Sequence, residues 1–156
     1  MLKKRITAMA GGGVLALVIA ALLSWYTPAT AAAGTVTVYK DPACACCGAW
    51  VEHMREAGFE VDVHDVRDLQ TIKAENGIAP RLGSCHTALV DGYVIEGHVP
   101  ADLVQKMLNE QPDFVGVSVP GMVVGSPGME VPGQPPQPYD VIAFDASGLT
   151  AVYAKR

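Results

Sequence analysis

The sequence Asp41-Pro42-Ala43-Cys44-Ala45-Cys46-Cys47-Gly48 places three of the four cysteines of the chain within four residues. The fourth, Cys85, stands alone and is followed directly by His86. Clustered cysteines serve as metal ligands, as a thiol–disulfide redox centre or as structural disulfides. The elements around the cluster decide among these uses, because they determine which sulfurs come together.

The residues that flank the cluster predict a strand before it and a helix after it. Residues 35–39 alternate β-branched and polar side chains, and Asp41-Pro42 ends this pattern. After the cluster, apolar residues recur at helical spacing up to Gly58; they are Trp50, Val51, Met54 and Ala57. Cys47 lies three and four residues before the first two of these. We therefore expect it at the helix start, on the buried edge.

The segment up to residue 111 continues to alternate strands with helices, and turn and cap residues mark the boundaries. Asp68 can cap a short helix that Gly77 ends, Asp91-Gly92 is a hairpin turn, and Pro100 opens a last helix. The further elements expected are a strand in 59–66, a helix in 69–76, strands in 87–90 and 93–96, and a helix from 100 to about 111. The predicted order is β-α-β-α-β-β-α.

Two histidines lie on the polar sides of these elements. His53 falls on the helix face that carries Glu52 and Glu56, and His64 alternates onto the same side of its strand as Asp62. Both are interpreted as surface residues rather than as metal ligands.

The composition changes after Gln111. Seven of the 11 prolines and five glycines fall in residues 112–138, which is too rich in turns for regular elements. Two alternating runs, 139–144 and 149–153, predict a terminal β-hairpin that either extends the sheet or caps the site. We therefore assign residues 34–111 to an α/β core and residues 112–156 to a Pro/Gly-rich extension and hairpin of the same domain.

The N-terminus has the parts of an export signal. Residues 3–5 are basic, residues 14–23 form an unbroken apolar run, and an A-x-A motif allows cleavage after Ala31 or Ala33. We predict a signal peptide over residues 1–33, with an uncleaved membrane anchor as the alternative. In either case the rest of the chain works outside the cytoplasm.

The charge of the remaining 123 residues excludes one class of partner. Eight basic and 16 acidic residues remain once the three basic residues of the signal are removed, a net charge of about −8. A nucleic-acid partner needs a basic face, so no nucleic acid is expected, and contact with a membrane is expected only through an uncleaved signal. The length suffices for one domain with its own core.

The element order resembles a thioredoxin-like fold, in which the turn between the first strand and the first helix carries a C-x-x-C motif. Cys44 and Cys47 have this spacing. A helix N-terminus stabilises a thiolate and lowers the pKa of a cysteine there. A thiol–disulfide oxidoreductase that uses Cys44 and Cys47 is therefore one interpretation.

Two features favour a metal site instead. Cys46 is a third sulfur inside the motif, whereas disulfide exchange needs only two thiols. Thioredoxin-like folds also place a cis-proline before the third strand, facing the C-x-x-C motif, and this chain has Gly83-Ser84-Cys85-His86 at that position. The fold would thus carry Cys85 and His86 to the cluster, so that four thiols and an imidazole meet.

The softness of these ligands favours cuprous copper over zinc. Zinc sites usually take their cysteines as separated pairs, and no second C-x-x-C is present. Cu(I) prefers thiolate and thioether donors, and bridging thiolates allow more than one ion to share few cysteines. Met122 and Met129 in the extension are further candidate donors, and they equally fit core or lid packing.

Three motifs of the chain resemble those of the CopG-like periplasmic copper-resistance family. They are the C-x-C-C signature in residues 39–48, a second block in residues 83–87 and 93–100, and Gly125-Ser126-Pro127-Gly128-Met129-Glu130. The resemblance spans about residues 36–153. Ala45 is a departure, because the family often has glycine there.

The resemblance implies a thioredoxin-like periplasmic protein that binds copper ions and works beside copper carriers or efflux components. It also implies Cu(I)/Cu(II) redox chemistry, and hence a copper oxidoreductase, at a thiolate-bridged site. It identifies Cys44, Cys46, Cys47 and Cys85 as the ligands. His86 and His98 are added as candidates that either bind the metal or support its ligands through hydrogen bonds and packing.

Overall fold

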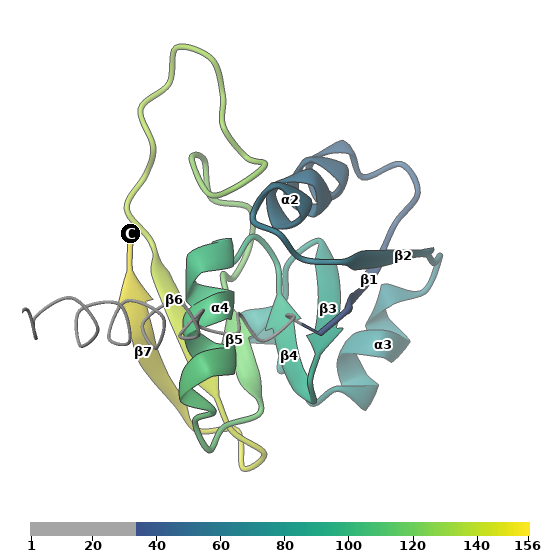
Figure 1. Ribbon diagram of the computed structural model, residues 1–156, viewed down its shortest axis with the longest axis vertical. Coiled ribbons are helices and arrows are strands. Elements are labelled where there is room, and N and C mark those ends of the chain that lie inside the picture. Colours follow the sequence, from purple (N-terminus) through teal and green to yellow (C-terminus); the bar gives the residue numbers. More distant parts are fainter. Residues whose placement is uncertain (1–33) are drawn as a thin grey trace, which may run out of the picture. The chain divides into compact units, whose positions relative to one another are not determined.

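The computed structural model describes residues 34–156, in which helices pack on one mixed sheet (Figure 1). The strands are β1 (Val36–Lys40), β2 (Val61–Asp65), β3 (His86–Val90), β4 (Tyr93–Glu96), β5 (Gly116–Ser118), β6 (Asp140–Phe144) and β7 (Thr150–Lys155). The helices are α2 (Ala45–Glu56), α3 (Leu69–Glu75) and α4 (Ala101–Glu110), with a 3-10 turn, η1, at Pro80–Leu82. The predicted signal peptide, residues 1–33, lies outside the described residues. Within 34–156, no helix has the length and apolar character needed to cross a membrane.

The strand register brings the two cysteine-bearing segments to one end of the sheet. The strand order is β2-β1-β3-β4-β5-β6-β7. β1 runs antiparallel to β3, and its last residue, Lys40, pairs with His86, the first residue of β3. The turn that leaves β1 therefore lies beside the loop that enters β3. Cys47 and Cys85, 38 residues apart in the sequence, meet for this reason.

Alternate strand residues face two apolar clusters. The larger cluster packs Ile95 of β4 against the buried stripes of α2 and α4, which are Trp50, Val51, Met54, Leu103, Val104 and Met107. The smaller cluster packs Val94 of β4 against Ile78 and Leu82, from the segment after α3. Because Val94 and Ile95 are adjacent in one strand, the two clusters lie on opposite faces of the sheet.

The predicted order β-α-β-α-β-β-α is confirmed, together with its boundary residues. Asp68 accepts hydrogen bonds from the backbone N–H groups of Gln70 and Thr71, as a helix cap does. Asp91 and Gly92 both have positive φ, at 47° and 84°, which a two-residue hairpin turn requires. Ala45, where the resembled family often has glycine, is simply the first residue of α2.

The extension contains one strand that its composition did not predict. β5 pairs in parallel with β4 and antiparallel with β6. It therefore joins the terminal hairpin to the core, and the hairpin extends the sheet rather than capping the site. A strand of three residues has too little periodicity to be seen in the sequence, since its stability comes from the two strands beside it.

His53 does not lie on the solvated face, so that expectation was wrong. The side chain is half-buried, and its Nε2 accepts a hydrogen bond of 3.1 Å from the backbone N–H of Ala101. The first amides of a helix have no partner within the helix, and His53 supplies one for α4. The periodicity of α2 could not show that another helix begins against this face. His64 is exposed and bonds Asp62, as expected.

Replacing Gly116 with alanine should detach the terminal hairpin from the core. A Cβ at this position would lie 2.1 Å from the carbonyl oxygen of Val94, so β4 and β5 would have to separate. We expect the free energy of unfolding, measured by urea denaturation, to fall by about 1–3 kcal/mol. Gly48→Ala is the matched control, because its Cβ would meet nothing within 4 Å and alanine favours a helix. Equal stability of the two variants would contradict the role given to β5.

Candidate metal centre

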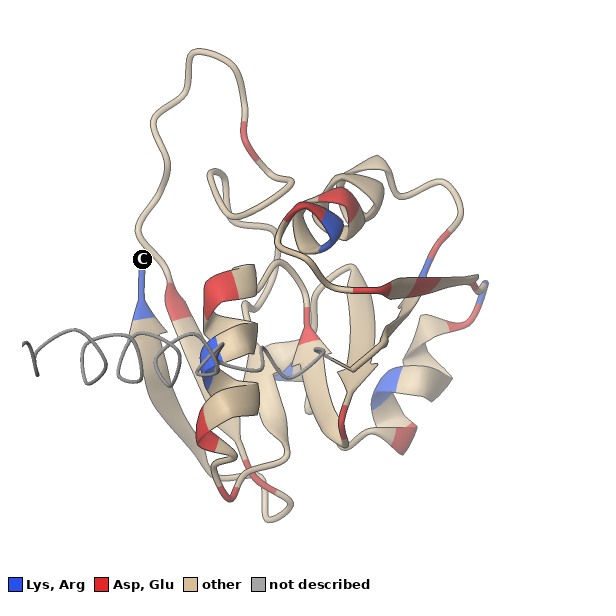
Figure 2. Ribbon diagram, viewed as in Figure 1, with Lys and Arg blue, Asp and Glu red and all other residues tan. Residues whose placement is uncertain are grey.

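Asp41 and the first turn of α2 build the segment that carries three cysteines. The Asp41 carboxylate accepts the backbone N–H of Ala43 at 2.7 Å, and its carbonyl oxygen accepts that of Cys44 at 3.0 Å. Cys44 is the N-cap of α2, and no side chain bonds the first helical amides. Residues 42–51 contain no charged side chain (Figure 2), and the Asp41 carboxylate directly before them lies near the positive end of the helix dipole.

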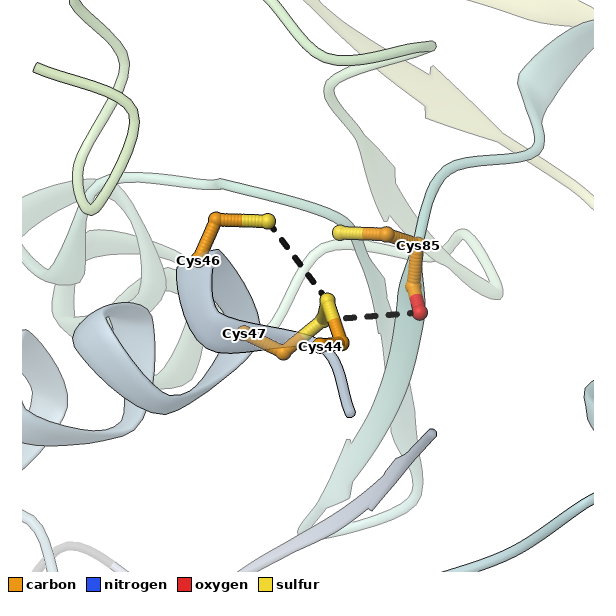
Figure 3. Close-up of side chains that lie close together, drawn as sticks. All are labelled: Cys44, Cys46, Cys47 and Cys85. Atoms are coloured by element: carbon orange, nitrogen blue, oxygen red, sulfur yellow. Dashed lines mark hydrogen bonds between the residues drawn. A yellow bond between two sulfur atoms is a disulfide. The ribbon is translucent and has the colours of Figure 1, made fainter. Parts of the chain in front are cut away.

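Cys44 and Cys47 form a disulfide in this structure (Figure 3). Cys46 and Cys85 are free and half-buried, and Cys47 is fully buried, on the helix edge that the sequence predicted. The Sγ atom of Cys46 lies 3.5 Å from that of Cys44 and is the hydrogen-bond donor, because a disulfide sulfur carries no proton. The C-x-x-C pair is thus oxidised, while the third sulfur of the motif remains a thiol.

Cys85 meets these sulfurs from the start of β3. Its carbonyl oxygen lies 3.6 Å from the Sγ atom of Cys47, and the Sγ atoms of all four cysteines lie within 4.8 Å of one another. No cis peptide bond occurs in residues 34–156. The segment from Gly83 to Cys85 leads directly into β3, which is the position at which a thioredoxin-like fold has its cis-proline. This is the convergence that the sequence predicted.

His98 is held between Cys85 and the extension. Its Nδ1 lies 2.8 Å from the carbonyl oxygen of Pro127, and its Nε2 lies 3.0 Å from the Sγ atom of Cys85. A carbonyl oxygen only accepts, so Nδ1 carries the proton and Nε2 of the neutral ring accepts the S–H of Cys85. The bond to Pro127 thereby fixes the tautomer of His98, and the lone pair of Nε2 points at the sulfur of Cys85.

The extension reaches the site through Gly128. This residue has a φ of +80°, and a Cβ there would lie 2.7 Å from the backbone nitrogen of Trp50 and 2.9 Å from the carbonyl oxygen of Cys46. Only glycine allows so close an approach. The next residue, Met129, is half-buried, whereas Met122 is 60% exposed. The role of these two methionines as metal donors stays a prediction.

His86 is fully buried between two aromatic rings. Its ring centroid lies 4.4 Å from that of Trp50 and 5.0 Å from that of His98. Its Nδ1 is 3.5 Å from the Sγ atom of Cys85, and its Nε2 has no hydrogen-bond partner. Buried polar atoms are usually paired, and leaving one unpaired costs about 1–3 kcal/mol. His86 thus directs Nδ1 at the free sulfur of Cys85, and Nδ1 is the ring nitrogen placed to bind a metal ion beside that sulfur.

Burial keeps the groups around Cys85 neutral. It raises the pKa of Cys85 to about 12, with the neighbouring Cys46 as the next cause. Burial also lowers the pKa of His98, against the opposing effect of its bond to Pro127, and it holds the pKa of His86 well below the ordinary value, with His98 as the next cause. A thiol and two neutral imidazoles therefore face one another at pH 7, and a bound cation would displace the thiol proton.

Two sets of donor atoms overlap at Cys85. One consists of the four cysteine sulfurs, and the other of Cys85, His86 and His98. Thiolate and imidazole suit copper and zinc rather than magnesium or calcium, so the residues present fit a soft metal ion. The four-sulfur set becomes a set of four thiolates only when the Cys44–Cys47 disulfide is reduced. The structure thus brings together the five principal candidate ligands and His98.

Solved structures of copper resistance protein copG are similar to this chain. The Form 2 structure is 41% identical in sequence, with 80% of this chain and 98% of that chain covered and a TM-score of 0.75, and Form 1 has the same identity and coverage with a TM-score of 0.74. The chain belongs to the CopG family. Residues 82–129 also match the family model described as "Protein of unknown function, DUF411". No curated protein matches the sequence.

The part of the site that sequence reasoning missed lies in the third family motif. Pro127 and Gly128 were recognised as part of that motif, but the carbonyl oxygen of Pro127 was not identified as the partner of His98. Every residue has a backbone carbonyl oxygen, so the amino-acid type at a position does not show that this oxygen serves as an acceptor. The available signal was the Gly-Ser-Pro-Gly order itself, because such residues mark a tight turn that brings backbone close to a neighbouring element.

The raised pKa of Cys85 predicts an unusual pH dependence of its alkylation. With the disulfide intact, the rate at Cys85 should still rise about tenfold per pH unit between pH 9 and 10, because thiolate is the reactive form. For the same reason the folded state should lose stability as pH rises from about 9 towards 12, since the unfolded chain gives up this proton first. Peptide mass spectrometry after iodoacetamide treatment measures the rate. In the urea-unfolded control the rate should level off near pH 9, and a plateau below pH 9 in the folded protein would contradict the prediction.

Proposed function

We propose that this protein binds Cu(I) through the sulfurs of Cys44, Cys46, Cys47 and Cys85, as a periplasmic component of copper resistance. One observation carries the proposal: four sulfur atoms from two distant segments lie within 4.8 Å of one another. The chain is also 41% identical to a copper resistance protein over nearly the whole length of that protein. Sulfur is the donor that Cu(I) prefers.

The arrangement of the sulfurs supports copper over zinc. Three of them come from one helical turn, including the adjacent Cys46 and Cys47, whereas structural zinc sites usually take two separated pairs. Cu(I) accepts low coordination numbers, so bridging sulfurs can hold more than one ion without four ligands around each. Imidazole nitrogens of His86 and His98 lie at the edge of the sulfur set and would complete the coordination of an ion near Cys85.

Copper can bind to four thiolates only after the Cys44–Cys47 disulfide is reduced. A dithiol reductant would transfer two electrons and two protons to the Cys44–Cys47 bond and itself become a disulfide, which gives four thiols in this chain whose protons the bound cations then displace. The predicted export signal and the disulfide both support a location outside the cytoplasm, because oxidising compartments preserve disulfides. Copper carriers and efflux components of the same compartment are the partners we propose on this basis.

The proposal is tested by an anaerobic Cu(I) titration of the reduced protein, with metal analysis. We expect more than one copper per chain, and less copper both in the unreduced protein and in Cys46→Ser. Cys85→Ala should also bind less, although it lies far from the cluster in the sequence. An excess of zinc should not displace the copper. Equal copper content in wild type and Cys46→Ser would refute the shared sulfur site.

A second candidate function is thiol–disulfide exchange, and the Cys44–Cys47 disulfide at a helix N-terminus specifically favours it. In this reaction a substrate disulfide would oxidise the reduced pair, which would leave two substrate thiols and re-form the Cys44–Cys47 bond.

An insulin-reduction assay separates the two functions. If exchange is the function, Cys46→Ser should retain full turnover, because the attacking and resolving thiols are intact, and Cys47→Ala should abolish it. If copper binding is the function, wild type should show no turnover above the dithiothreitol background. Turnover at a rate typical of thioredoxins would make exchange the leading interpretation.

A further inference from the structure

A buried carboxylate lies behind the loop that carries Cys85. Glu96, on β4, has no exposed surface, and Lys73 of α3 is 6% exposed. The Oε1 atom of Glu96 accepts the Lys73 ammonium at 2.5 Å, and its Oε2 atom accepts the hydroxyl of Thr87 at 2.7 Å. Lys73 also donates to Thr87 at 3.1 Å. Charges so deeply buried are costly unless each is paired and hydrogen-bonded, as both are here.

The same carboxylate holds the backbone immediately before Cys85. Oε1 of Glu96 accepts the backbone N–H of Ser84 at 2.5 Å. The Ser84 hydroxyl donates to the carbonyl oxygen of Gly121 at 2.5 Å. The backbone N–H of Gly121 in turn donates to the carbonyl oxygen of Gly83 at 3.0 Å. Ser84 is therefore fixed on two sides by hydrogen bonds, one of them to an ionised group and hence stronger than a neutral one.

The loop between Leu82 and His86 is buried at both ends and open on one side. A cavity of about 410 Å³ lies beside it, lined by residues of α3 and η1 together with Gly83 and Ser84. A loop next to a cavity of this size lacks the close contacts that fix a core residue. Burial in the core therefore fixes Leu82 and His86 at the two ends of the loop, and the hydrogen bonds to Ser84 fix the backbone between them.

Glu96 cannot itself reach the metal donors. Its neighbour two residues back in β4, Val94, belongs to the cluster on the α3 side of the sheet, and side chains two residues apart in a strand share a face. His86 contacts Trp50 of α2, on the opposite face. Glu96 thus acts on Cys85 through the chain on either side of it, by its bonds to the Ser84 amide and the Thr87 hydroxyl, of which only the first is a bond to the backbone.

We infer that Glu96 is a positioning residue for Cys85, which holds the sulfur against the cysteine cluster through its hydrogen bond to the Ser84 amide. In thioredoxin-like folds the segment at this place is fixed by a cis-proline, and the chain here has a buried hydrogen-bond acceptor instead. The inference rests on the proposed copper function, because it concerns the geometry of that site. Supporting groups of this kind change metal affinity by about 10–100-fold when removed.

Two double variants distinguish the loss of the hydrogen-bond acceptor at Glu96 from the loss of its buried charge. Lys73→Met/Glu96→Gln and Lys73→Met/Glu96→Leu both remove the buried ion pair, but only glutamine keeps an oxygen that can accept the Ser84 N–H. Cu(I) affinity is measured for each by competition with a Cu(I) chelator. We expect the leucine variant to bind at least tenfold more weakly than the glutamine variant. In a Cys85→Ala background this difference should fall below twofold, because the effect passes through Cys85.

Each possible result of these affinity measurements either supports the inference or overturns it. Equal affinity of the two double variants overturns it, and so does a difference that persists without Cys85, which would mark a general effect on the fold. If the leucine variant does not fold, Glu96→Asp replaces it. That variant keeps both charges and shortens the reach to Ser84, so a tenfold loss of affinity is again expected and unchanged affinity overturns the inference.

Hydrogen exchange of metal-free protein gives a readout that does not involve copper. The Ser84 amide should exchange at least tenfold faster in the leucine variant than in the glutamine variant, while core amides of β1 exchange alike in both. An unchanged Ser84 rate overturns the inference. If wild type binds no Cu(I) but the Ser84 rates differ as expected, the proposed function fails while the anchoring of the loop by Glu96 stands.

Discussion

The pairing of Lys40 with His86 in the antiparallel β1–β3 ladder is the constraint on which the site depends. It sets the distance between the turn that carries Cys44 to Cys47 and the residue before β3. A shift of the register by two residues would move Cys85 by about 7 Å along the strand, which is more than the 4.8 Å within which all four sulfurs lie. A shift of one residue would turn His86 to the other face. The apolar alternation that fixes the sheet in register therefore also assembles the metal donors.

Much of this arrangement could be predicted from the sequence, because it follows from local signals. Asp68, Gly77 and Asp91-Gly92 mark the ends of elements, and the resulting order implied that Cys85 meets the cluster. The features that could not be predicted depend on partners far away in the chain. β5 exists because β4 and β6 lie on either side of it, and His53 is half-buried because α4 begins against it. The oxidised Cys44–Cys47 pair was one of several open alternatives, since spacing permits a disulfide without requiring it.

The part of the extension between β5 and β6, residues 119–139, has a defined backbone path although it contains no helix or strand. Its backbone is fixed by specific hydrogen bonds, among them Gly125 to Met129 at 3.0 Å and Gln137 to Val124 at 2.9 Å. It touches the site at three places: at Gly121, which holds Ser84; at Pro127, which orients His98; and at Gly128, which lies against α2. All three contacts use backbone atoms. Proline and glycine suit such a segment, because they set the path of the backbone instead of supplying side-chain chemistry.

The oxidation state of one disulfide decides which donors the site offers. With Cys44 and Cys47 joined, the free thiols are Cys46 and Cys85, and the set of Cys85, His86 and His98 is complete. Reduction adds two thiols that already lie within 4.8 Å of the others, so the change in donor chemistry needs no rearrangement of the sheet. Cys85 is common to both sets, and it comes from the residue directly before β3 rather than from the first turn of α2. Anchoring its backbone on a buried carboxylate therefore stabilises the geometry of the site in either state.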